Sequence, residues 1–107
     1  MARDELILNM IEVIDRIPKG KVSSYSGVGR AMTPPTGGRQ VGRLLFTLGD
    51  PHVCAWWRVV AADGTLSIAK LNPMAAQEQR HRLEAEGIAF RGEKVGREFF
   101  IEPVEID

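Results

Sequence analysis

Ala55-Trp56-Trp57-Arg58-Val59-Val60, followed at once by Ala61-Ala62-Asp63-Gly64, is the stretch that decides the fold. An apolar run that ends in two β-branched valines and meets Asp-Gly predicts a short strand entering a tight turn. Trp56 and Trp57 are the only tryptophans, and neighbouring side chains of an extended segment point to opposite faces. One indole is therefore expected to fill the core while the other lines a site. Taken alone, the run is more typical of a core strand than of a binding pocket.

The segments before this stretch predict a helix-turn-helix. A short helix is expected from about Ser24, its cap, to Met32, and residues 33–38, rich in proline and glycine, form the connecting turn. A second helix follows from Arg39 to about Leu48. Such a pair commonly places its second helix in a DNA groove. The arginines of the second helix are also compatible with an ordinary solvated face.

The remaining elements follow from helical spacing and turn signals. Residues 4–17 predict an amphipathic helix, capped by Asp4 and stopped before Pro18. Residues 65–68 alternate and predict a strand that pairs with the preceding one. Asn72-Pro73 predicts the start of a helix that runs to about Glu86, with residues 77–82 on a wet outer face.

The C-terminal segment predicts a hairpin. Residues 88–91 and 98–101 carry strand-like residues and flank the glycine-containing segment 92–96. Length and composition, 107 residues with 44% apolar content, predict one small domain over residues 1–107, with a C-terminal extension at about 88–107.

Composition also excludes several classes of protein. No apolar run approaches the roughly 18 residues of a membrane span, and no signal peptide is evident, so we expect a cytoplasmic protein. Cys54 is the only cysteine, which excludes an internal disulfide. Two scattered histidines give no zinc-like spacing, so no metal or cofactor is expected.

The charges are unevenly distributed although the net charge is zero. Residues 19–58 carry six basic side chains and one acidic side chain, Asp50, a net charge of +5, and the remainder carries −5. A basic middle of this kind could face phosphates while the acidic remainder faces away.

Three motifs resemble those of the O6-alkylguanine-DNA alkyltransferases, in the same order. Residues 55–60 resemble the family's Pro-Cys-His-Arg-Val-Val, residues 17–25 resemble the segment that ends in Val-Ser-Tyr, and Arg39-Gln40-Val41-Gly42 resembles Arg-Ala-Val-Gly. The resemblance covers about residues 4–88. It implies an α/β, mostly helical fold with a single winged helix-turn-helix-type DNA-binding domain, as in the alkyltransferase C-terminal domain.

The resemblance also implies a loss of chemistry. Trp56 falls where the alkyl-accepting cysteine belongs, and Trp57 falls where its histidine belongs. An indole supplies neither a thiolate nor a base, so alkyl transfer is expected to be absent. Tryptophan at the cysteine position marks the alkyltransferase-like proteins. The implied function is to bind and flip O6-alkylguanine in duplex DNA and to flag it for nucleotide excision repair proteins, without being an enzyme.

Site residues follow from the matched positions. Tyr25 matches the tyrosine that crowds the phosphate 3′ of the target, and Arg39 matches the arginine that fills the space left by the flipped base. Residues 67–71 correspond to the family's loop that closes over the base, and Lys70 is the nearest candidate for the cation that alkyltransferase-like proteins often place there. Asp50-Pro51 stands where the family has Asn-Pro, and Ala55 replaces a proline, which predicts a looser backbone there. Arg58 is expected to anchor the strand.

The predicted residues fall into two groups. The lesion pocket comprises Trp56, Tyr25, Val59, Val60 and Lys70, with backbone groups near Val59 and Val60 reading the base edge. The DNA-binding set comprises Tyr25, Arg39, Ser24, Gln40 and Arg43.

The chain is expected to act as a monomer. Two other functions stay open. One is an alkyltransferase that uses Cys54, although an unactivated thiol has a pKa near about 8.5 and no basic partner follows it. A small buried apolar role suits Cys54 better. The other is a sequence-specific winged-helix regulator that binds an undamaged operator.

Overall fold

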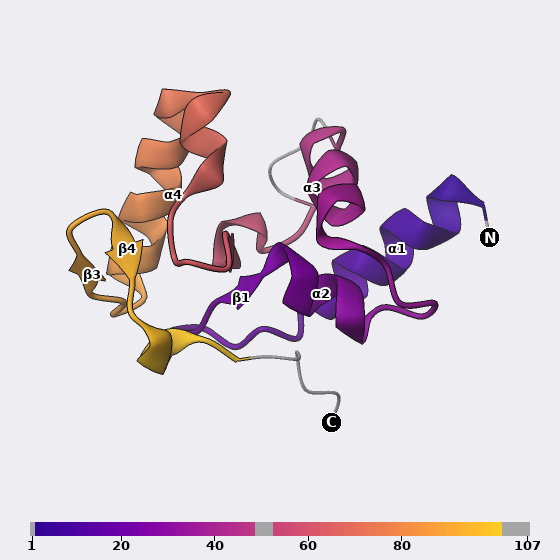
Figure 1. Cartoon of the computed structure of the whole chain (residues 1–107), viewed down its shortest axis with the longest axis horizontal. Helices are drawn as coiled ribbons and strands as arrows, with labels where there is room; N and C mark the ends of the chain where they lie inside the picture. Colours follow the sequence, from indigo (N-terminus) through magenta and orange to yellow (C-terminus); the bar gives the residue numbers. More distant parts are fainter. Residues whose placement is uncertain (1, 49–52, 102–107) are drawn as a thin grey trace.

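The computed structural model describes residues 2–48 and 53–101 of the chain. Figure 1 shows α1 (Arg3–Ile14), α2 (Tyr25–Ala31) and α3 (Gly38–Phe46) grouped on one side, with α4 (Pro73–Ala85) on the other. Residues 56–70 run between the two groups. None of the helices in the described ranges is long and apolar enough to cross a membrane.

The N-terminal helix is shorter than predicted at its C-terminal end. α1 covers Arg3–Ile14 rather than residues 4–17, and Ala2 rather than Asp4 is its N-cap. Asp4 lies in the first turn, where a negative charge favours the helix dipole. Met10, Val13 and Ile14 are fully buried against α2 and α3, as the helical spacing predicted.

α2 and α3 form the predicted helix-turn-helix. Ser24 caps α2, because its Oγ accepts a hydrogen bond from the Gly27 N–H at 2.9 Å. The connecting turn folds back on Gly29, whose carbonyl accepts the Thr36 N–H at 2.8 Å. A Cβ at Gly29 would overlap the Thr36 carbonyl, so only glycine allows this close connection.

The tryptophan segment differs from the prediction. Trp56–Arg58 form a 3₁₀-helix, η1, and only Val59–Val60 are a strand, β2. β2 pairs in parallel with β1 (Ser23–Ser24), with Ser23 opposite Val59. The strand is therefore paired with the start of the helix-turn-helix.

The predicted strand at residues 65–68 is wrong. The Ala61–Thr65 turn closes on itself, with the Ala61 N–H donating to the Thr65 carbonyl at 2.9 Å, and Ser67–Lys70 form a second 3₁₀-helix, η2. Gly64 has a φ of 92°, which favours glycine, and its carbonyl accepts the Val95 N–H at 2.9 Å. The turn therefore contacts the C-terminal hairpin instead of extending β2.

α4 begins as predicted. The Asn72 side chain accepts the Ala75 N–H at 3.1 Å, Pro73 occupies the first turn, and Gly87, with a φ of 91°, follows the helix end. The wet face predicted at residues 77–82 is confirmed only in part: residues 77, 78 and 81 are exposed, Arg80 and Arg82 are half-buried, and Gln79 is 2% exposed. His81 is exposed.

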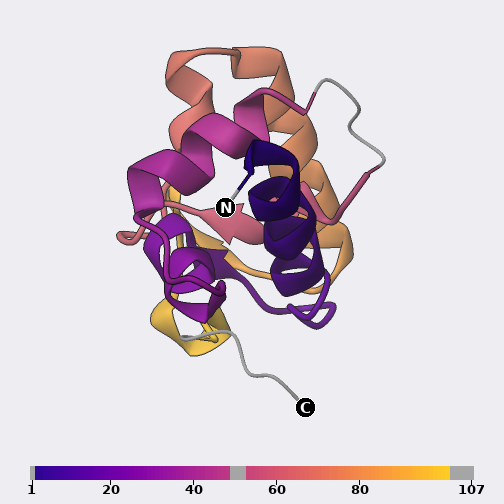
Figure 2. The same cartoon turned by 90° about the vertical axis from the view of Figure 1, so that its right-hand side faces the viewer.

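The C-terminal hairpin closes earlier than predicted. β3 (Phe90–Arg91) pairs antiparallel with β4 (Lys94–Val95), because Gly92, with a φ of 62°, permits a tight turn between them. The second strand predicted at residues 98–101 is wrong: Arg97–Phe99 form a 3₁₀-helix, η3, and Phe100 bridges Val22. In Figure 2, which turns the molecule by 90°, η3 is the yellow turn at the lower edge of the molecule.

Among residues 2–48 and 53–101, buried apolar side chains form two clusters. The first joins α1, α2 and α3 with Cys54, Ala55 and Val59. The second joins Val22 and Val60 with Leu83, Ile88 and Val95 under the hairpin. Val59 and Val60, adjacent in sequence, point into different clusters, so β2 ties the two halves of the molecule together.

Candidate nucleic-acid interface

A cavity of about 210 Å³ lies where α3, η1 and the start of α4 face one another. Its lining is mostly apolar and comprises Tyr25, Leu45, Phe46, Leu48, Cys54, Trp56, Val59, Ile68, Ala75 and Gln79. Apolar and aromatic walls with few polar groups are typical of pockets for small molecules or bases. The cavity could therefore accept a flat, partly apolar group such as a purine.

The two tryptophans leave η1 in different directions. Their rings meet edge to face, with centroids 6.2 Å apart and an interplanar angle of 87°. Trp56 lines the cavity, and its indole N–H is buried with no hydrogen-bond partner among the described residues. Trp57 turns away toward α4. The prediction that one indole lines a site is thus met by Trp56, although through a 3₁₀-helix rather than a strand.

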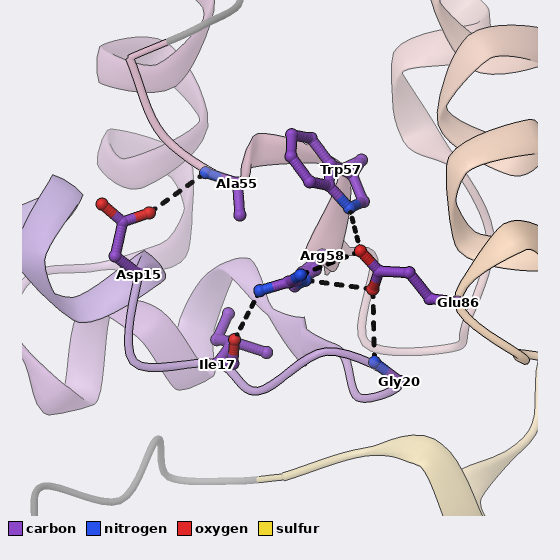
Figure 3. A network of polar contacts seen from close by, with 7 residues as sticks. All are labelled: Asp15, Ile17, Gly20, Ala55, Trp57, Arg58 and Glu86. Carbon is purple, nitrogen blue, oxygen red and sulfur yellow. Dashed lines mark hydrogen bonds and ion pairs between the residues drawn. The ribbon is translucent and has the colours of Figure 1, made fainter.

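Glu86, at the end of α4, holds Trp57 and Arg58 in a polar network (Figure 3). Its carboxylate accepts the Trp57 indole N–H at 2.9 Å and two guanidinium N–H groups of Arg58 at 3.0 and 2.8 Å. It also accepts the Gly20 N–H at 3.2 Å, while Arg58 donates to the Ile17 carbonyl at 2.9 Å. The prediction that Arg58 anchors this segment is confirmed.

The same network sets the charge of Glu86. Burial would raise the pKa of this carboxyl, but hydrogen bonds from Arg58, Trp57 and the Gly20 backbone outweigh burial and lower the pKa. Glu86 is therefore ionised at neutral pH. Its oxygens are committed to holding η1 against α4 and the turn at Gly20.

Two further side chains fasten the backbone around η1. Gln79 donates to the carbonyl oxygens of Trp57 at 3.1 Å and of Val59 at 2.9 Å. The Ala55 N–H donates to the Asp15 carboxylate at 3.1 Å, a bond that a proline at this position could not make (Figure 3). A hydrogen bond to Asp15 thus stands where the family's proline would constrain the backbone, and the looser backbone at Ala55 stays a prediction.

Cys54 is a buried part of the cavity wall. The residue is 7% exposed, and burial, followed by the nearby Asp15 carboxylate, raises the pKa of its thiol to about 11. At neutral pH the thiol is protonated, and a protonated thiol is a poor nucleophile. The expectation of a small buried apolar role for Cys54 is confirmed.

A second hollow, of about 450 Å³, adjoins the cavity along α2 and α3. We call it the groove. It is lined by Ser24, Tyr25, Ser26, Gly38, Arg39, Gly42, Arg43, Phe46, Ala61, Ala62 and Ser67. The side chains of Arg39 and Arg43 are exposed, so their cations are available to phosphates.

Tyr25 lines both the groove and the cavity. Its hydroxyl accepts a hydrogen bond from the Ser67 hydroxyl at 3.3 Å, which links α2 to η2. Burial raises the pKa of Tyr25, and the bond from Ser67 partly opposes this. Gly42 faces the Tyr25 ring, which leaves room for the ring beside α3.

The structure brings most of the predicted site residues together. Trp56, Tyr25 and Val59 line the cavity, and Tyr25, Ser24, Arg39 and Arg43 line the groove. The roles given to these residues stay predictions. Ser24 is almost fully buried and also caps α2, so its hydroxyl already serves the fold.

Three predicted residues lie elsewhere. Val60 is fully buried in the second cluster, Lys70 is exposed at the end of η2 and does not line the cavity, and Gln40 is exposed outside the groove lining. The Val59 carbonyl, expected to read the base edge, already accepts the Gln79 amide. Asp50-Pro51 lies outside the described residues.

Phe46 and Gln79 line the cavity but were not predicted as site residues from the sequence. Phe46 stands three and seven residues after Arg43 and Arg39, so helical spacing alone places it on the arginine-bearing face of α3. Gln79 lies between Ala76 and Leu83 at helical spacing, which marks a buried position. Among residues 2–48 and 53–101, no group of three or more His, Cys, Asp or Glu is placed to hold a metal ion.

Comparison with known proteins adds independent findings. The family model for the DNA-binding domain of 6-O-methylguanine DNA methyltransferase matches residues 6–88. A DNA base-flipping protein of Vibrio parahaemolyticus is 35% identical over 79% of this chain and 82% of its own length. Alkyltransferase-like protein 1 of Schizosaccharomyces pombe is 34% identical over 82% of this chain and 81% of its own.

A solved structure agrees with the fold. The crystal structure of S. pombe Atl1 in complex with damaged DNA containing O6-carboxymethylguanine superposes with a TM-score of 0.78 at 31% identity. The match covers 96% of this chain and 100% of that chain. The predicted α/β DNA-binding fold of the alkyltransferase type is confirmed.

Proposed function

This chain belongs to the 6-O-methylguanine DNA methyltransferase DNA-binding domain family, as an alkyltransferase-like member, and on that premise we propose that it binds O6-alkylguanine in duplex DNA and does not remove the alkyl group. The observation that carries the proposal is the cavity walled by Trp56. It opens beside a groove that presents Arg39 and Arg43.

The geometry suits an extruded nucleotide. A base inside the duplex cannot reach a cavity behind a protein surface, so it must rotate out of the stack, at a cost of a few kcal/mol. Arg43 can hold a phosphate while Trp56 and the apolar lining receive the purine and its alkyl group. In this proposal Tyr25, at the boundary of groove and cavity, contacts the backbone of the flipped nucleotide, and Arg39 fills the vacated space.

The side chains at the wall disfavour alkyl transfer. The Trp56 indole carries no nucleophilic lone pair, because its nitrogen is a hydrogen-bond donor only. The Cys54 thiol, with its pKa near 11, is protonated. Trp57 has its only polar group bonded to Glu86 and cannot act as a base. No activated nucleophile therefore stands among the side chains that line the cavity.

The biological outcome in this proposal is a signal rather than a repair. A protein that binds the lesion and leaves it intact presents a persistent, distorted complex to other proteins. We infer that nucleotide excision repair proteins are its partners and that the complex shields the lesion from alkyltransferases. The protein acts as a monomer in the cytoplasm, without a cofactor.

The main test compares affinities for one duplex that carries either guanine or O6-methylguanine at one position, at a single stated salt concentration. We expect the lesion duplex to bind about tenfold more tightly or better, because only the modified base is readily extruded and held. Equal affinities would indicate a regulator that reads undamaged DNA.

A second experiment tests the absence of transfer. The duplex carries a radiolabelled O6-methyl group, and the protein is denatured and separated after incubation. We expect the label to stay with DNA, and Cys54→Ala to bind like the wild type. Stoichiometric label on the protein, lost in Cys54→Ala, would establish an alkyltransferase instead.

A further inference from the structure

Phe46 stands at an unusual place for a large apolar side chain. It is the last residue of α3 and is 43% exposed. Isolated apolar side chains are common on protein surfaces and need no explanation by themselves. Phe46, however, lines both hollows of the site, and it shares this position with Tyr25 alone among the described lining residues.

The other residues on the face of α3 that carries Phe46 are two arginines and a glycine. Arg39, Gly42 and Arg43 precede it at intervals of seven, four and three residues, so all four lie on one side of the helix and line the groove. The apolar face, with Val41 and Leu44, packs into the core on the other side. Phe46 therefore does not belong to the core-facing side of α3. Its ring follows Arg39 and Arg43 along the groove side of the helix and lies where the groove meets the cavity.

A flipped nucleotide would have to pass this ring. Its phosphates remain at the groove, within reach of Arg43, while its base enters the cavity, so its sugar and base edge cross the boundary marked by Tyr25 and Phe46. An aromatic ring offers a nucleotide a stacking and apolar contact that does not depend on sequence. In an undamaged duplex the bases stay stacked, and the ring has no such partner.

We propose that Phe46 is a specificity-determining residue that packs against the extruded nucleotide where it passes from groove to cavity, and so favours lesion-bearing over undamaged DNA. The inference rests on the proposed function and adds a contact to it. Arg43, on the same face, differs from Phe46 because a phosphate contact strengthens binding to both duplexes alike.

The test measures the dissociation constants of Phe46→Ala for the guanine and O6-methylguanine duplexes. We expect roughly tenfold weaker binding to the lesion duplex, as for the loss of one base–aromatic contact, and unchanged binding to the undamaged duplex. Phe46→Tyr keeps the ring and should retain lesion affinity. Leu8→Ala is the matched control, because Leu8 is exposed but lines neither hollow.

The outcomes separate this inference from the proposed function. Equal losses on both duplexes, or no loss on either, would overturn the role of Phe46 while the wild-type preference for the lesion still stood. Loss in Phe46→Tyr as large as in Phe46→Ala would overturn the ring contact. A wild-type protein without preference would refute the proposed function itself. Thermal unfolding of each variant confirms that it is folded.

Discussion

Replacing Glu86 by glutamine should destabilise the protein, because this carboxylate accepts four hydrogen bonds that join α4, η1 and the turn at Gly20. The Glu86 and Arg58 side chains are 9% and 16% exposed. Breaking a buried ion pair by removing one partner typically costs about 3–5 kcal/mol. Arg58 keeps its bond to the Ile17 carbonyl and some access to water, so we expect a loss of about 2–3 kcal/mol.

Urea unfolding followed by tryptophan fluorescence measures this loss. With a slope of about 2 kcal/mol per molar urea, the midpoint should fall by about 1–1.5 M. The matched control is Glu84→Gln, because Glu84 is 50% exposed and pairs with Arg80 at 3.4 Å on the helix surface. That change should cost under about 0.5 kcal/mol.

The pH dependence gives the same prediction a second readout. The pKa of Glu86 is lowered from its ordinary value of 4.5, so its contribution to stability is present above that value and is lost as pH falls through the lower folded-state pKa. The difference between wild type and Glu86→Gln should therefore narrow in acid. A variant as stable as Glu84→Gln at pH 7 would refute the role given to the network.

Three further predictions concern the groove and the cavity. Arg39→Ala should weaken lesion binding by about tenfold or more, because no side chain then replaces the extruded base; wild-type affinity would remove Arg39 from that role. Ser67→Ala should raise the pKa of Tyr25, the only tyrosine of the chain, which tyrosinate absorbance reports directly; an unchanged pKa would mean that the 3.3 Å bond does not persist in solution. Cys54 should react slowly with iodoacetamide at pH 7.5 and faster as pH approaches 11, and rapid labelling at neutral pH would contradict the buried thiol.

Elements whose ends are set by local chemistry were predictable from the sequence. The Ser24 cap, the Asn72-Pro73 start and the proline- and glycine-rich turn all lie where the patterns placed them. Each is decided by hydrogen bonds or φ angles within a few residues, and such signals are fully contained in a short window.

Elements whose structure depends on residues far away in the sequence could not be predicted from local patterns. Residues 65–68 alternate like a strand, but β2 pairs with β1, far away in sequence, and the Ala61–Thr65 turn leads elsewhere. The burial of Gln79 depends on the Trp57 and Val59 carbonyls, which only the folded chain brings to α4. No local pattern contains these partners.

The resemblance predicted that Trp56 and Tyr25 belong to one site. Which of the other predicted residues line that site could be seen only in the folded structure. Trp56 and Tyr25, distant in sequence, do line one cavity. Lys70 was chosen for its charge and position in a loop, but η2 turns it to solvent and presents Ile68 to the cavity instead. Phe46 was not predicted, because its place in the cavity wall depends on Trp56 and Ile68, which only the folded chain brings to α3.

A crystal structure of the protein bound to a duplex that carries O6-methylguanine would test the central claim most directly. We expect the modified purine to lie outside the helix and against Trp56, between Tyr25 and Phe46, with its methyl group still attached. A purine that remains stacked in the duplex, or a methyl group found on Cys54, would contradict the account.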